Sequence, residues 1–337
     1  MKPVRLLWLI AIVALGWSAW WGWGAWTTEH NLTRWLEARR AQGWQAEWSD
    51  ISVKGYPTRI DTTISGLTLA NTAAGWVWNT PFFQILGLNY EKNHYVLVWA
   101  DSMDLQTPSE RIAVDGEDLR GSVTFVPGAA RELDDATLVF KGLALSSDAG
   151  WTATLDEMRL ASRPNENRAN TMRDVALELA GLHPESAALQ NLARLGIVSP
   201  NVERLNADLT VTFDRPWDRT ALEDAHRPQP RAIDIRDAGI LWGKLELRVA
   251  GDLTMDASGT VSGRMQIKAT NWRDMLALMR QTGTVPDAVV DTIDAALKLL
   301  SGLVGPSDTL DIPLTFADGH TRIGIVPVGP APVIRLP

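Results

Sequence analysis

The feature that most constrains this chain is an apolar run near its start, from Leu6 to Trp26, which contains no charged side chain. At a rise of about 1.5 Å per residue, a helix of this length spans about 31 Å, close to the roughly 30 Å hydrocarbon core of a bilayer. Lys2 and Arg5 precede the run, so the positive-inside rule places residues 1–5 in the cytoplasm and exports the rest. We therefore predict a cytoplasmic stub over residues 1–5 and a transmembrane anchor over residues 6–26. Tryptophans crowd the second half of the anchor, as in an interfacial aromatic belt: Trp17, Trp20, Trp21, Trp23 and Trp26.

A cleaved signal peptide is the alternative interpretation of this run. Small residues stand at the two positions that a cleavage site requires in Ala14-Leu15-Gly16 and in Gly22-Trp23-Gly24. The first is followed by a bulky aromatic residue and the second lies late in the segment, so we favour the uncleaved anchor. Under either interpretation the body of the chain is exported, and the absence of cysteine fits an oxidising compartment. The predicted localisation is a single-pass protein of the bacterial inner membrane with its bulk in the periplasm.

Residues 27–43 are predicted to form a juxtamembrane helix. Leu32, Trp35 and Leu36 make one apolar stripe, and Gly43 supplies a helix stop. Three arginines of this segment either touch lipid headgroups or form a solvated face: Arg34, Arg39 and Arg40.

After Gly43 the apolar period changes from helical to two, which indicates strands. Alternating segments such as "TRIDTTISGLTLA", "LNADLTVTF" and "LELRVAGDLTMD" are separated by turn residues and short connections, which favours antiparallel pairing. Three helices interrupt them, at Pro184–Leu195, Asn271–Thr282 and Pro286–Leu303, with Asn271 as an expected N-cap. The predicted fold class is mainly β (α+β): a long, curved, mostly antiparallel sheet with a few packed helices over residues 44–330, then an extended tail over residues 331–337.

One motif, Gly55-Tyr56-Pro57, stands between the first two long alternating segments. Proline has no amide hydrogen and glycine admits positive φ, so this is predicted to be a tight corner between strands rather than an active-site loop. We expect Tyr56 to be packed. Arg59 and Asp61 are two residues apart, so they share one face of the second strand and can share a hydrogen-bond network.

The chemical motifs of common enzyme classes are absent from the sequence. It has no GxSxG elbow, no HExxH, no Walker loop and no GxGxxG. The formal net charge of −8 argues against nucleic-acid binding, and the lack of cysteine removes thiolate chemistry. The histidines are scattered singly, which is typical of hydrogen-bonded surface residues: His30, His94, His183, His226 and His320. We predict a non-catalytic protein with no cofactor and no metal.

Several segments, in order, resemble the DUF2125 family of uncharacterised, mainly alphaproteobacterial proteins. They are "KGYPTRIDTTISGL", "GWVWNTPFFQILGLNYEKNHYVLVW", "LWGKLELRVAGDLTMDASGTVSGRMQIKATNWRDMLALMRQTGTV" and "LDIPLTFADGHTRIGIVPVGPAPVI". The corner resembles a Gly-Phe/Tyr-Pro-x-Arg element of other anchored periplasmic β proteins, matched here by Gly55, Tyr56, Pro57 and Arg59. That resemblance implies an AsmA-like relationship, with an inner-membrane anchor that carries a long antiparallel sheet.

Two functions remain open from the sequence. The first is lipid handling or outer-membrane biogenesis, in which an apolar sheet face holds lipid acyl chains. The second is a periplasmic scaffold that binds another envelope protein through a sheet edge or through its terminal helices.

Overall fold

The computed structural model describes residues 3–72, 75–166, 170–221, 227–283, 285–304 and 308–336. Strands account for 53% of the chain and helices for 23%, which confirms the prediction of a mainly β fold. The chain divides into two compact units. Unit 1 comprises residues 1–125 and 147–149, and unit 2 comprises residues 126–146 and 150–337.

Unit 1 consists of one long helix, α1 (Pro3–Ala41), and an antiparallel sheet. Its strands are β1 (Gln45–Glu47), β2 (Asp50–Lys54), β3 (Arg59–Asn71), β4 (Trp76–Leu88), β5 (Glu91–Trp99), β6 (Ser102–Gln106), β7 (Arg111–Asp115) and β8 (Asp118–Phe125). β1 and β2 both pair with β3, which pairs with β4. β4 then pairs with β5 and β6, which continue to β8 and β7 respectively.

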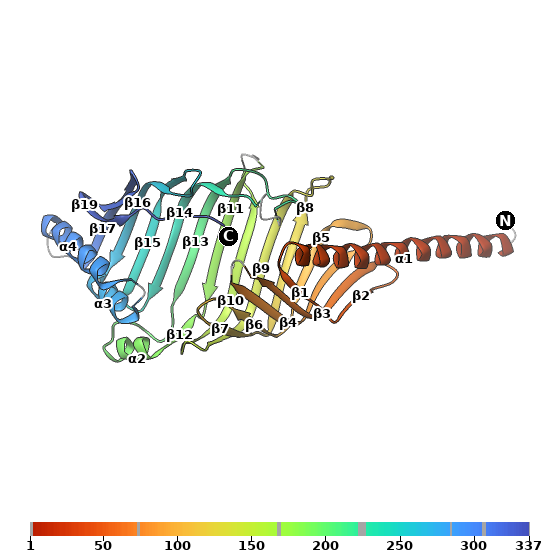
Figure 1. Ribbon diagram of the computed structural model, residues 1–337, viewed down its shortest axis with the longest axis horizontal. Coiled ribbons are helices and arrows are strands. Elements are labelled where there is room, and N and C mark those ends of the chain that lie inside the picture. The colour runs from red at the N-terminus through yellow and green to blue at the C-terminus, as the bar shows by residue number, and fades with distance from the viewer. Residues whose placement is uncertain are drawn as a thin grey trace. The chain divides into compact units, whose positions relative to one another are not determined.

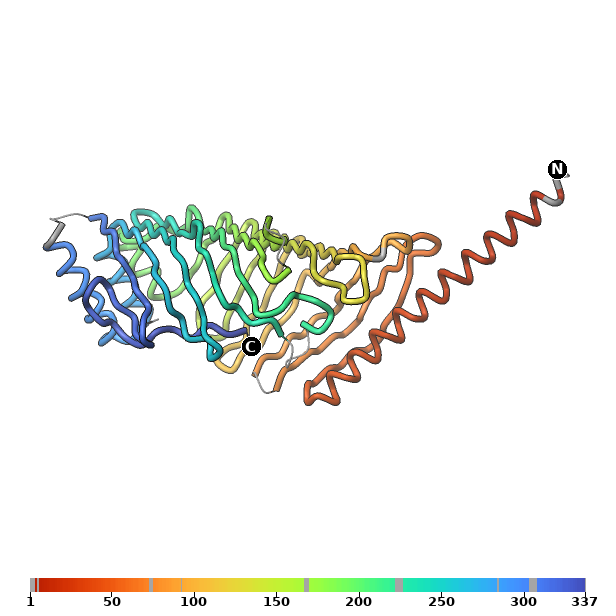
Figure 2. The backbone as a smooth tube through the Cα atoms, turned by 90° about the horizontal axis from the view of Figure 1, so that it is seen from above, coloured from red at the N-terminus to blue at the C-terminus, as the bar shows by residue number. Residues whose placement is uncertain are grey.

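The predicted anchor and juxtamembrane helix are one continuous helix in the structure, with no break between them. Its N-terminal part extends away from the strands, and its C-terminal part lies beside β1–β3 (Figures 1 and 2). There Leu36 is buried in a core with Ile51 and Ile64. The helix ends before Gly43, whose φ of +88° supports the predicted stop.

One of the three predicted arginines, Arg39, does not behave as predicted, whereas Arg34 and Arg40 are exposed. Arg39 neither reaches headgroups nor lies on a solvated face, because it is only 4% exposed and its guanidinium lies over Trp35 and Trp44. Arg40 donates from Nε to the carbonyl of Ala46. The apolar stripe of this helix packs on β1–β3, and this packing also buries the aliphatic part of the Arg39 side chain.

Unit 2 is a second run of antiparallel strands with three helices, α2 (Ala187–Arg194), α3 (Trp272–Thr282) and α4 (Asp287–Val304). The strands pair mostly in chain order, as a meander from β9 to β19. They are β9 (Leu133–Ser147), β10 (Thr152–Pro164), β11 (Met172–Ala180), β12 (His183–Glu185), β13 (Arg204–Phe213), β14 (Pro230–Trp242), β15 (Leu245–Met255), β16 (Val261–Thr270), β17 (Thr309–Ala317), β18 (His320–Ile323) and β19 (Val326–Pro330).

The three predicted helices are present with small shifts in their boundaries. α2 begins after Ser186, whose side chain accepts from the amide of Leu189, so the sequence placed its start too early. Asn271 stands at the predicted N-cap position of α3, but its φ is +58° and its side chain donates to the carbonyl of Lys244 instead of capping the helix. Gly283 ends α3 in the left-handed conformation, with a φ of +63°.

Candidate functional site

The predicted Gly-Tyr-Pro corner joins β2 to β3 and lies against α1. Gly55 has a φ of +103°, and a Cβ there would lie 2.7 Å from Cβ of Arg59, so the turn requires glycine. The Tyr56–Pro57 peptide bond is cis. The corner is thus built as the sequence predicted, but its neighbour is the apolar helix.

Two tryptophans of α1 hydrogen-bond the backbone of the corner. Trp17 Nε1 donates to the carbonyl of Pro57 at 2.8 Å, and Trp21 Nε1 donates to the carbonyl of Arg59 at 2.7 Å. The ring of Tyr56 meets that of Trp21 edge-on, with 5.5 Å between centroids. These contacts fix β3 to the side of the helix.

Tyr56 itself corrects a prediction, since it is 56% exposed instead of packed. The helix covers only one side of its ring, and its hydroxyl lies 2.8 Å from Ser18 Oγ. Because Ser18 donates its own hydrogen to the carbonyl of Ala14, the tyrosine is the donor. Arg59 and Asp61 do share one face, with Nε 2.9 Å from a carboxylate oxygen, but Arg59 is half-exposed, so the pair contributes little to stability.

A second candidate site is one face of the unit 2 sheet. Directly paired residues form an apolar row that runs without interruption across neighbouring strands from β9 to β17. Its members are Leu138, Leu160, Leu177, Ala207, Ala238, Val249, Ile267 and Ile312. Two residues further along each strand, and so on the same face, a second row repeats the pattern. Its members are Phe140, Met158, Leu179, Leu205, Ile240, Leu247, Ala269 and Leu310.

The opposite face is mostly polar. The row that lies between these two, with side chains on the other side of the sheet, contains Val139, Arg159, Glu178, Asn206, Gly239, Arg248, Lys268 and Asp311. The sheet of unit 2 therefore has one apolar and one polar face. Seven strand-to-strand steps of about 4.8 Å give each row a length of roughly 34 Å.

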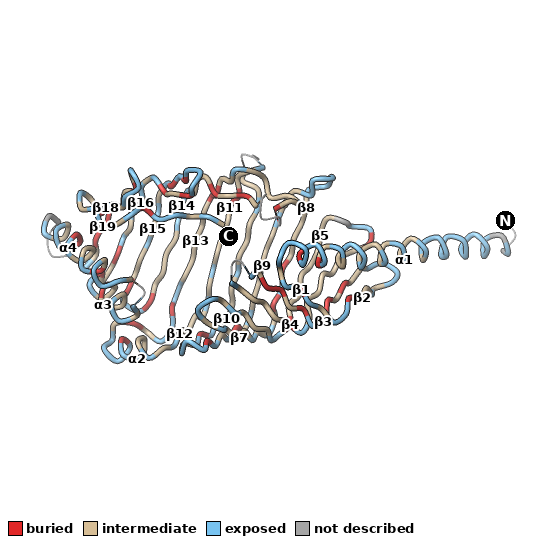
Figure 3. The backbone as a smooth tube through the Cα atoms, in the orientation of Figure 1, coloured by how far each residue is buried: buried red, intermediate tan, exposed pale blue. Residues whose placement is uncertain are grey.

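Among the described residues of unit 2, the β9–β11 end of the apolar face is only half-buried. Leu138, Leu160, Leu177, Ala207 and Ala238 are only half-buried. The helices cover the other end of the face. Leu205 and Ile240 pack against a core that includes Leu192 of α2, and Leu247, Ala269 and Ile312 belong to or pack against the core under α3 and α4. Figure 3 shows the same intermediate burial along β13. An ordinary core face would be closed by a second layer.

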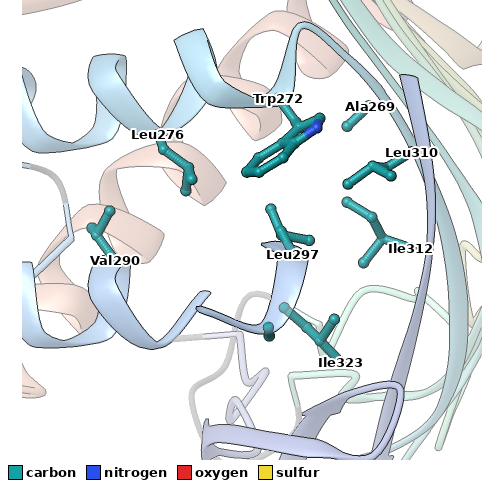
Figure 4. Close-up of a cluster of buried hydrophobic side chains, with 9 residues drawn as sticks. Ala269, Trp272, Leu276, Val290, Leu297, Leu310, Ile312 and Ile323 are labelled. Carbon is teal, nitrogen blue, oxygen red and sulfur yellow. The ribbon is translucent and has the colours of Figure 1, made fainter. Parts of the chain in front are cut away.

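At the β15–β19 end of this face, α3 and α4 border a partly open apolar cavity of about 490 Å³. Trp272, Leu276 and Leu297 point from the helices toward the sheet residues Ala269 and Ile312 (Figure 4). The walls also include half-buried side chains from both helices and from the connection between them: Met275, Met279, Val285, Val289 and Ile293. Thr321 is the one polar side chain among the described lining residues, and it donates to the carbonyl of Pro330 at 2.8 Å. A cavity of this size and polarity suits an apolar ligand.

An ion cluster on the outside of the two helices holds them together. Arg280 of α3 lies 2.9 Å from Asp291 and 3.5 Å from Asp294, both on α4. Lys298 lies 3.0 Å from Asp294, and its hydrogen bond is the main cause that lowers the pKa of that carboxylate below its ordinary value. These exposed ion pairs link the two helices that border the cavity.

Polar networks in unit 2 are structural in character. Arg173 is buried and donates to the carbonyls of Leu133 and Asp134, at 2.8 and 2.7 Å, and burial lowers its pKa. Burial alone would raise the pKa of Asp174. Hydrogen bonds from Asn165, Thr210 and Arg236 outweigh this effect and lower it below its ordinary value.

The histidines form no catalytic or metal-binding group in the part of the chain that the structure describes. His30 stacks on Trp26, His94 bonds Ser122, His183 lies between Asn201 and Glu185, and His320 donates to the carbonyl of Asp318. His226 lies outside the described residues. Within those residues, no three His, Asp or Glu side chains gather closely enough to hold a metal ion.

The family of the chain follows from comparison with family models. A model described as "Uncharacterized protein conserved in bacteria (DUF2125)" matches residues 21–332. The chain belongs to the DUF2125 family. Comparison with curated proteins and with solved structures found no match. The corner, the apolar face and the cavity all lie within the region shared with DUF2125.

The apolar face of this DUF2125 protein was not located from the sequence, which gave only the alternation within single strands. The rows depend on register, and register includes a bulge in β14 between Ile235 and Ala238. In a regular strand, residues three or five apart face opposite sides of the sheet. The extra residue of the bulge instead puts Ala238 and Ile240 on the same face as Ile235. In "AIDIRDAGILW" the two consecutive charged residues Arg236 and Asp237 interrupt the alternation of apolar and polar residues. This interruption is the sequence signal that could have revealed the bulge.

Proposed function

We propose that this DUF2125 protein is a non-catalytic, membrane-anchored lipid-handling protein that holds acyl chains on the apolar face of its unit 2 sheet. The observation that carries the proposal is the pair of uninterrupted apolar rows, whose residues on β9–β11 are only half-buried and which end in the cavity under α3 and α4. Each methylene that leaves water for such a surface contributes about 0.8 kcal/mol.

The dimensions of the face suit this role. An extended acyl chain reaches across one leaflet, about 15 Å, so a row of roughly 34 Å is longer than one chain. The absence of charged side chains from both rows favours hydrocarbon over a headgroup. The face therefore fits chains laid across the strands.

α1 supports the membrane-bound part of the proposal. Its most apolar window has a mean hydropathy of 1.5, and none of that window is buried, although a signal sequence would share these properties. We place the residues before Leu6 in the cytoplasm and the sheets in the periplasm of a bacterial inner-membrane protein, because Lys2 and Arg5 flank the helix on one side.

Photo-crosslinking on the full-length chain tests the proposal. The protein is reconstituted in vesicles, a palmitoyl lysophospholipid with a photoactivatable group in its chain is added, and crosslinked tryptic peptides are quantified by mass spectrometry. The peptide Asp274–Arg280 carries the cavity residues of α3, and the peptide Leu6–Arg34 carries the anchor.

Crosslinks on both peptides are expected. Labelled Leu6–Arg34 with no label on Asp274–Arg280 or on any peptide of the strands from β9 to β17 would refute acyl-chain binding while leaving the anchor in place. A scaffold that binds another envelope protein through the same face predicts no lipid label on unit 2. The experiment therefore separates lipid handling from the scaffold function.

A further inference from the structure

The Gly-Tyr-Pro corner touches α1 at an unexpected depth. Its contacts with the helix begin at Trp17 and continue through Ser18 and Trp21. From Leu6 to Trp17 the helix rises only about 17 Å. A bilayer core of roughly 30 Å that begins at Leu6 would extend to about Trp26, and helix tilt would only lengthen the segment needed.

We propose that the corner, Gly55 to Arg59, lies in the outer leaflet of the bilayer beside α1, so that this protein enters the membrane with a strand corner as well as with its helix. This inference rests on the proposed transmembrane role of α1. The occupant of the exposed side of the corner is then the lipid of the same membrane.

The hydrogen bonding of the corner fits this location. Backbone carbonyls at membrane depth need donors from the protein, because no water is present to supply them. The carbonyls of Pro57 and Arg59 accept from indoles of α1, that of Thr58 accepts from the amide of Asn89, and that of Gly55 accepts from the amide of Arg59. The hydroxyl of Tyr56 is likewise satisfied by Ser18 rather than by solvent.

The exposed side chains around the corner also suit a lipid interface. Tyr56 is 56% exposed and Tyr90, in the adjoining β4–β5 turn, is 65% exposed. Lys54 and Arg59 flank the corner and can reach phosphates from there.

Spin labels on single cysteines test the depth directly, since the chain has no cysteine of its own. Thr58→Cys places a label on the corner without altering Tyr56 or Pro57. Leu9→Cys, on an exposed position of α1, is the lipid control, and Gln42→Cys, at the far end of the same helix, is the water control. Each full-length variant is reconstituted in vesicles, and label accessibility to oxygen is compared with accessibility to a water-soluble nickel complex.

The oxygen-to-nickel ratio at Thr58→Cys is expected to be several-fold above that at Gln42→Cys and nearer to that at Leu9→Cys. Equal ratios at Thr58→Cys and Gln42→Cys, with Leu9→Cys in lipid, would overturn the inference and leave the anchor intact. A water-like ratio at Leu9→Cys would overturn the anchor and the inference together. Tyr90→Cys gives a second reading of the same depth if Thr58→Cys does not fold.

Discussion

Filling the cavity of unit 2 should weaken acyl-chain binding by an amount that the structure allows us to calculate. Ile293 lies on α4 and forms part of the cavity wall. In Ile293→Trp the larger ring extends into the space of about 490 Å³ that a chain would occupy. Displacing roughly three methylenes at about 0.8 kcal/mol each gives about 2.4 kcal/mol. We therefore expect roughly 50-fold weaker binding.

The apparent Kd for the photoactivatable lysophospholipid is obtained from the dose dependence of crosslinking on the peptide Asp274–Arg280. The crosslink yield on the peptide Leu6–Arg34 reports the amount of photoactivatable lipid in the bilayer. It is used to normalise the yield on Asp274–Arg280 at each lipid concentration. Leu299→Trp is the matched control, because Leu299 lies on the same helix, is 50% exposed and does not line the cavity. Its Kd should equal that of the unmodified chain.

The reasoning fails if Ile293→Trp keeps the unmodified Kd while unfolding at the same temperature as Leu299→Trp. In that case the bound acyl chain would not occupy the space that Ile293 borders. A loss of binding in both variants would equally contradict it, because an exposed tryptophan on α4 has no reason to affect the cavity.

Three further predictions concern stability. Gly55→Ala should cost about 1–3 kcal/mol, because φ is +103° and the new Cβ meets Arg59, and should speed tryptic cleavage at the corner. Arg173→Met should lower the free energy of unfolding by about 3 kcal/mol, because it leaves buried carbonyls without donors, whereas the exposed Arg163→Met should change it by less than about 0.5 kcal/mol in the same thermal scan. Asp174→Asn should cost about 2 kcal/mol at neutral pH. Because the pKa of Asp174 is depressed in the folded state, the carboxylate stabilises the fold above its unfolded pKa, and this stabilisation is lost as the pH falls through the folded pKa. In denaturant unfolding at about pH 3, the free energies of unfolding of Asp174→Asn and of the unmodified chain should therefore differ less than at neutral pH.

Much of the fold could be predicted because it depends on local pattern. The period-two segments around Ile64 and Val211 became strands, and the stripe around Leu36 became a helix face. The corner was also predictable, since Gly55 and Pro57 restrict the backbone wherever they stand.

What the sequence did not predict depends on contacts between distant segments. Trp17 looked like a membrane-belt residue, but it donates to Pro57, forty positions away. Arg39 looked solvated on its helix, yet packing against β1–β3 buries it. The apolar rows depend on the register of many pairings, and one bulge in β14 changes which residues face which side.

The apolar face of unit 2 is difficult to explain without an occupant. Row residues such as Leu177 and Ala207 keep part of their apolar surface in water, which is unfavourable. Interstrand hydrogen bonds hold the sheet whether or not that face is covered, so the fold does not need a second layer to form. An acyl chain on the rows would remove the exposed apolar surface and would stabilise the folded state by mass action. The uncovered face is therefore better explained as a binding surface than as an incomplete core.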